Sequence, residues 1–119
     1  MTLSFTMKRH DTLPIRTLSL IQTDPNNPAA MIPVDLTNAA SAKLIAKIPN
    51  ALPAITFTTA LTFGSPRTGG TVIYTAASGD TATSGTYQAE VEVTWTTPAG
   101  VETFPNDGYF TIIVVDDLG

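Results

Sequence analysis

The most regular pattern in the chain is an alternation of apolar and polar residues between positions 86 and 95. The apolar or aromatic set occupies every second position: Tyr87, Ala89, Val91, Val93 and Trp95. The set between them is polar: Thr86, Gln88, Glu90, Glu92 and Thr94. A period of two predicts a β-strand with one buried and one solvated face. The Gly-, Ser- and Thr-rich stretch before this strand must fix its register, because a slip of one residue would put Trp95 in water.

Shorter runs of the same kind recur along the chain, separated by clusters of Pro, Gly and Asn. They predict further strands at residues 3–7, 15–23, 54–63, 71–76, 101–104 and 109–115. The strand at 54–63 is expected to contain a bulge near Thr59 and Ala60. Residues 24–28 hold two prolines and two asparagines, and therefore predict a surface loop.

The end of the chain is expected to form hairpins. Residues 97–100 predict a turn into the strand at 101–104, and residues 105–108 predict a second turn into the last strand. That last strand is apolar on both faces apart from Thr111. It is therefore predicted to be a central strand, or a strand that a partner covers.

Residues 39–48 fit two patterns. They contain good helix formers, and Asn38 could cap a helix. They also alternate, with Ala40, Ala42, Leu44, Ala46 and Ile48 on one face and Ser41, Lys43 and Lys47 on the other. Ile45 breaks the alternation, but the neighbouring strand signals favour a strand.

Seven or eight short strands in 119 residues predict an all-β fold, an immunoglobulin-like antiparallel β-sandwich. The length favours a single domain covering residues 1–119. The chain has no cysteine, so neither a disulfide framework nor a thiolate metal site can form. An ordinary hydrophobic core must hold the fold.

The net charge of −4 is unevenly distributed along the sequence. The first 67 residues contain all six lysines and arginines and three acids, whereas the rest contain seven acids and no lysine or arginine. Such asymmetry would favour head-to-tail packing of identical subunits, unless folding mixes the charges over one surface. The N-terminus lacks the order of a signal peptide, and no apolar run is long enough to span a membrane. A soluble protein made in the cytoplasm is expected.

Candidate chemistry is sparse. His10 is the one histidine and lies in the polar stretch Lys8-Arg9-His10-Asp11, where a solvated turn is favoured over a ligand or general base. This basic cluster could contact phosphate or nucleic acid, but a salt bridge to an acidic neighbour is the better interpretation. The acids that could bind calcium do not follow the EF-hand spacing: Asp80, Glu90, Glu92, Asp107, Asp116 and Asp117. No enzyme, cofactor or metal site is predicted, and Asp80 is expected to fix a turn by accepting N–H bonds from residues just ahead.

Four aromatic side chains are candidates for a sugar-binding platform: Tyr87, Trp95, Phe104 and Tyr109. Tyr87 and Trp95 lie on the apolar face of their strand, so core packing is favoured for both. Tyr109 follows a turn, and its hydroxyl is expected to hold that corner.

Four segments together resemble a known family. They are "MKRHDTLP", "PVDLTNA", "SGDTATSGTYQAEVEVTW" and "VETFPNDGYFTIIV". In this order they resemble the N-terminal domain of phage baseplate upper proteins, a virion domain of tailed phages, and residues 39–70 carry the least of the likeness. The resemblance implies a non-catalytic immunoglobulin-like sandwich that docks a receptor-binding apparatus to the tail. The sequence ends at Gly119 without the coiled-coil or fibre region of that family, which leaves the location in tail or capsid open.

The expected function is therefore that of a phage structural protein in the virion, in tail or baseplate or as an adaptor. The alternatives are a capsid decoration or head-fibre protein and a carbohydrate- or host-surface-binding module. Expected partners are other virion proteins and further copies of the chain, with no membrane and no nucleic acid. Two groups of residues are candidate protein contacts: Lys8, Arg9 and His10 in the basic turn, and Gln88, Glu90, Glu92 and Thr94 on the polar strand face.

Overall fold

The computed structural model describes residues 4–13, 15–77, 79–105 and 108–116. In these residues it contains ten strands and one short 3-10 helix, η1. The elements are β1 (Phe5–Lys8), β2 (Arg16–Ser19), β3 (Ile21–Asp24), β4 (Asn27–Pro33), β5 (Ala39–Ile48), β6 (Ile55–Phe63), η1 (Arg67–Gly69), β7 (Thr71–Tyr74), β8 (Gly85–Thr96), β9 (Ala99–Phe104) and β10 (Phe110–Val115). Among these described residues, no helix is long and apolar enough to cross a membrane.

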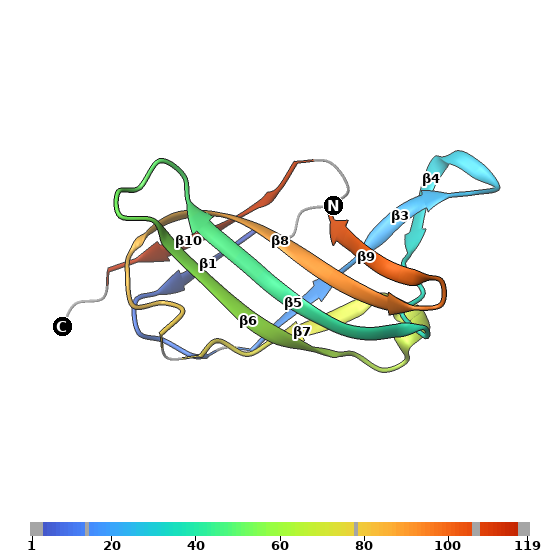
Figure 1. Cartoon of the computed structure of the whole chain (residues 1–119), viewed down its shortest axis with the longest axis horizontal. Coiled ribbons are helices and arrows are strands. Elements are labelled where there is room, and N and C mark those ends of the chain that lie inside the picture. Colours follow the sequence, from blue (N-terminus) through green and yellow to red (C-terminus); the bar gives the residue numbers. More distant parts are fainter. Residues whose placement is uncertain (1–3, 14, 78, 106–107, 117–119) are drawn as a thin grey trace.

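The predicted all-β sandwich is confirmed, and its two layers come from one curled sheet (Figure 1). Eight strands form this sheet in the order β1-β10-β8-β5-β6-β7-β2, with β9 paired to β8 beside β10. Strand β6 joins the layers, because residues 55–61 pair with β5 and residues 62–63 pair with β7. One pairing departs from the antiparallel expectation: β1 runs parallel to β10.

The last two strands, β9 and β10, share one partner, β8. Strand β9 pairs with β8 from Val91 to Thr96, and β10 pairs with the same edge of β8 from Gly85 to Ala89. The hairpin between β8 and β9 is confirmed, whereas the described register assigns β9 and β10 to β8 and not to each other. The predicted second hairpin is therefore wrong, and β10 is central because it lies between β1 and β8. Asn106 and Asp107 of the predicted turn lie outside the described residues.

Residues 39–48 form a strand, as the neighbouring strands suggested, but their inward face was predicted with one error. The register with β8 shifts between Ala39 and Ser41, which leaves Ala40 as an extra residue. Ala39 is consequently buried and Ala40 exposed. The bulge predicted near Thr59 and Ala60 is absent from the register, which runs without a shift along the pairing of β5 with β6.

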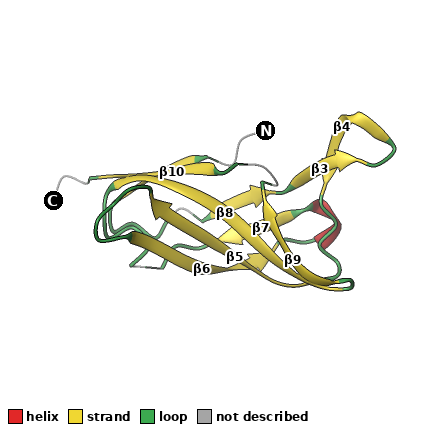
Figure 2. Ribbon diagram, turned by 45° about the horizontal axis from the view of Figure 1, so that its top comes forward, coloured by secondary structure: helices red, strands yellow, loops and turns green. Residues whose placement is uncertain are grey.

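The predicted strand at 15–23 is divided into β2 and β3. Between them Leu20 turns into the core, where it is buried, and its N–H donates to the carbonyl of Gly70 at 2.7 Å. Strand β3 then pairs with β4, a strand that the sequence pattern did not predict. The predicted loop at 24–28 is only the tip of this hairpin, which projects from the sandwich (Figure 2). Pro14, and Leu3 of the first predicted strand, lie outside the described residues.

The core fills the space between the two layers. Its largest buried side chains come from both: Tyr74, Tyr87, Phe104, Leu20, Leu36, Leu44 and Ile112. Phe57 lies between the two tyrosines, with ring centroids 6.4 Å from Tyr74 and 5.3 Å from Tyr87. Tyr87 is therefore in the core as predicted, whereas Trp95 is half-buried at its margin.

Arg16 bridges the two ends of the curled sheet. From β2 its guanidinium donates to the carbonyl of Thr6 in β1 at 2.7 Å and lies 5.2 Å from the centroid of the Phe5 ring. A hydrogen bond and a cation–π contact thus connect strands that do not pair through their backbones in the described register.

Candidate contact surfaces

The predicted basic turn follows β1. Lys8 is exposed at the end of the strand, and Arg9 is half-buried beside Asp116, with 3.8 Å between Nη1 and Oδ1. His10 is exposed and has a left-handed backbone (φ 69°), and its N–H donates to the carbonyl of Thr81 at 3.0 Å. The salt bridge that the sequence favoured is present within the chain, and it leaves Lys8 as the exposed basic side chain that faces outward here.

Thr81 and Asp80 attach this turn to the body of the protein. The Thr81 hydroxyl, which is buried, donates to the carbonyl of Asp11 at 3.0 Å. The buried carboxylate of Asp80 accepts bonds from the Tyr74 hydroxyl at 2.9 Å, the Ala77 N–H at 3.1 Å and the Thr59 hydroxyl. Asp80 therefore binds Ala77, which precedes it in the chain, and side chains of β6 and β7. The prediction that it accepts bonds from the N–H groups of residues that follow it is wrong. Burial, and secondly the bond to Asp80, raise the pKa of Tyr74.

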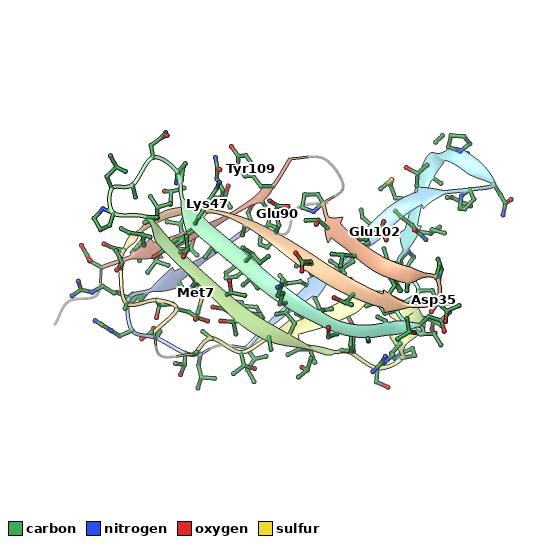
Figure 3. All side chains as sticks on the ribbon, viewed as in Figure 1. Met7, Asp35, Lys47, Glu90, Glu102 and Tyr109 are labelled. Carbon is green, nitrogen blue, oxygen red and sulfur yellow. The ribbon has the colours of Figure 1, made fainter. Side chains whose placement is uncertain are left out.

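The predicted polar face of β8 lies on the outer surface of the sheet. Glu90 is exposed there (Figure 3). Gln88, Glu92 and Thr94 are half-buried. Their exposure is reduced by β5, whose Lys47, Ile45 and Lys43 pair with Gln88, Glu90 and Glu92.

An ion pair within this face neutralises one of its acids. Lys43 Nζ lies 3.3 Å from Glu92 Oε1. The alternation along β5 predicted that Lys43 and Lys47 share one face. It did not predict that Lys43 lies beside Glu92, because the alternation within one strand contains no information about which strand is its neighbour. The face is therefore mixed in charge.

The two predicted contact groups form separate surfaces. In the register, Lys8 is beside Val115, whereas Gln88 is beside Thr111, four residues earlier in β10. The rest of the polar face of β8, from Glu90 to Thr94, extends further from Lys8 along the strand. A single partner would thus have to cover β10 in order to touch both groups.

The outer face of β10, which lies next to both groups, is largely apolar, with Thr111 half-buried between Tyr109 and Ile113. Two side chains of β10 and the residue before the strand are exposed on the outside: Tyr109 by 53%, Ile113 by 39% and Val115 by 37%. This matches the prediction that the last strand is apolar on both faces, since Phe110, Ile112 and Val114 are buried on its inner side. These outer residues were not named as contacts from the sequence. The signal that could have identified them is the continuous apolar run of the last strand. Other large apolar side chains are exposed elsewhere: Leu13, Ile15, Met31, Leu52 and Val101.

The candidate metal ligands and aromatic side chains lie apart from one another. Within them, no group of three or more His, Cys, Asp or Glu side chains could hold a metal ion. Tyr87 and Phe104 are buried, and the Trp95 indole N–H donates to Glu102 Oε1 at 3.1 Å, so three of the four candidate aromatics are turned to the core or its margin. Tyr109 is exposed, but the other three aromatic side chains do not lie beside it on the surface as a platform. Asp107 and Asp117, two of the acids considered for calcium, lie outside the described residues.

No model of a known protein family matches this chain, and no curated protein matches its sequence.

Proposed function

We propose that this chain is a non-catalytic structural domain of a bacteriophage particle, a tail or baseplate component or adaptor that acts by docking onto other proteins. The observation that carries the proposal is the largely apolar outer face of β10, where Tyr109, Ile113 and Val115 are exposed on either side of the half-buried Thr111. Apolar side chains that gather on the outside of a small domain favour a protein partner. The virion setting rests on the four sequence segments that resemble the phage baseplate domain.

Two features support docking over carbohydrate binding. The outer sheet face presents β-branched, apolar and charged side chains, and such mixtures are common at protein interfaces. A sugar site would need an exposed aromatic platform, whereas Tyr87 and Phe104 are buried. A capsid decoration protein would use the same surfaces, so it stays the alternative to a tail component.

The test is to locate the chain in particles. Lysates of cells that produce the phage encoding it would be separated on a density gradient into tails, heads and complete particles, and the chain detected with an antibody. We expect it in complete particles and in the tail fraction. Detection with heads alone would favour the decoration alternative, and a chain that stays with free proteins in every gradient would contradict the proposal.

A further inference from the structure

The hairpin of β3 and β4, residues 21–33, projects from the sandwich, and we call it the arm (Figure 1). Its tip carries the one Asp–Pro peptide bond of the chain, between Asp24 and Pro25. Pro25 and Asn26 form the turn between the two strands and are exposed, whereas Asp24 is half-buried at the end of β3. This peptide bond is therefore open to water while the chain is folded.

The carboxylate of Asp24 is held beside this bond. Its Oδ1 accepts the N–H of Asn26 at 2.9 Å, so the ring closed by this hydrogen bond contains the Asp24–Pro25 peptide group. Asp24 is the only titratable residue of the arm, and none of the ion pairs between described residues involves it. A carboxylate in this position is a nucleophile close to its own backbone carbonyl carbon, and such proximity accelerates a reaction.

Pro25 supplies a better leaving group than an ordinary residue. Its nitrogen carries no N–H and is alkylated by the ring, so it takes up a proton more readily than the nitrogen of other peptide bonds. A second aspartate provides the contrast, because Asp35 Oδ1 accepts the N–H of Thr37 at 3.0 Å in the same way. The residue after Asp35 is Leu36, which is buried and whose N–H donates to the carbonyl of Arg67 at 3.0 Å. The two turns thus hold a carboxylate alike but differ in the nitrogen that would have to leave.

We propose that the folded chain cleaves itself between Asp24 and Pro25 in acid. A side-chain oxygen of Asp24 attacks the backbone carbonyl carbon of the same residue and forms a cyclic anhydride. The C–N bond to Pro25 breaks, and the proline nitrogen leaves as a secondary amine with a proton from the acidic solvent. Water then opens the anhydride, so that Asp24 becomes a new C-terminus and Pro25 a new N-terminus.

The sandwich holds the two fragments together after the cut. The fragment that ends at Asp24 contains β1, β2 and β3, which pair with β10, β7 and β4 of the other fragment. Its side chains Met7, Leu18 and Leu20 are buried in the common core. The product is therefore a domain of two chains with new ends at the tip of the arm, and its formation is independent of the docking role.

The test follows the full chain by intact-mass spectrometry at neutral pH and at the lowest pH at which circular dichroism shows the native fold. We expect the fragments 1–24 and 25–119 to accumulate in acid, while the bond between Asp35 and Leu36 stays intact. Asp24→Asn removes the nucleophile and should slow the cut about a hundredfold or more. Pro25→Ala leaves a poorer leaving group and should slow it about tenfold. Glu90→Gln removes an exposed carboxylate on β8 and is the control that should cleave like the wild type.

Size-exclusion chromatography of the cleaved protein at neutral pH tests the two-chain domain. We expect both fragments to elute together and to separate in urea, and fragments that separate without urea would overturn this part. A chain that stays whole throughout the acid incubation would overturn the cleavage itself. So would cuts after Asp24 and Asp35 at similar rates, or a rate that Asp24→Asn leaves unchanged.

Discussion

The hydroxyl of Tyr74 donates a hydrogen bond to the carboxylate of Asp80 at 2.9 Å, and both side chains are buried. The same carboxylate also binds Thr59 of β6 and the N–H of Ala77, so it connects two strands to the loop that precedes β8. This loop in turn holds the basic turn after β1 through Thr81.

Replacement of Asp80 should therefore destabilise the whole domain. Asp80→Ala leaves the buried Tyr74 hydroxyl and two further donors without their acceptor, and we expect a loss of about 3 kcal/mol in the free energy of unfolding. Asp80→Asn keeps one acceptor oxygen and should lose less. Urea unfolding measures both, with Glu90→Gln, at an exposed acid on the outer face of β8, as the control. A loss below about 1 kcal/mol for Asp80→Ala would show that the three bonds do not hold the loop.

The stability should fall at alkaline pH in a manner that depends on Tyr74. Its pKa is raised in the folded state, by burial and then by Asp80, so the folded chain keeps this proton when the unfolded chain has lost it. The contribution of Tyr74 to the free energy of unfolding is complete below about pH 10, the ordinary pKa of tyrosine. It is lost as the pH rises further, by up to about 1.4 kcal/mol per pH unit. Burial raises the pKa of Tyr87 in the same direction.

Tyr74→Phe isolates this effect. The advantage of the wild type over the variant in the free energy of unfolding should shrink between about pH 9 and pH 11. Lysines and the other tyrosines titrate in both proteins and cancel in the comparison. An advantage that stays constant over this range would contradict the shifted pKa.

Two adjacent glycines should respond very differently to alanine. At Gly70 the left-handed backbone and the close approach of Leu20 and Val34 both oppose a Cβ, and we expect Gly70→Ala to lose about 3 kcal/mol or more. At Gly69 nothing lies within 4 Å of the position that a methyl group would occupy, so Gly69→Ala should change the stability by less than about 0.5 kcal/mol. Thermal unfolding of the pair measures the difference, and equal losses would argue against a close backbone contact of Gly70 with Leu20 and Val34 at the base of the β3–β4 hairpin.

The ion pair on the polar face should matter little for stability. The side chains of Lys43 and Glu92 are 47% and 27% exposed, and such pairs are worth about 1 kcal/mol or less. A double-mutant cycle with Lys43→Ala and Glu92→Ala should give a coupling in that range, decreasing with salt. A coupling above about 2 kcal/mol would mean that the face holds the sheet together and is not free to serve as a contact surface.

Strand periodicity was sufficient for the elements that bury one face. The strand that became β8 was predicted with its inner face, because alternate residues of a strand point to opposite sides whatever the strand pairs with. The same reasoning placed Ala42, Leu44 and Ala46 of β5 correctly and failed at Ala40. A bulge depends on the partner strand, and the sequence of β5 alone does not contain it.

The sequence by itself thus determined the all-β class, the main strands and the absence of cysteine chemistry, since these follow from local pattern and composition. Only the tertiary structure decided that β9 and β10 share an edge of β8, that Lys43 meets Glu92, and that residues 21–33 leave the sandwich as an arm. Backbone hydrogen bonds are the same for every strand, so the choice of partner depends on how distant side chains pack together.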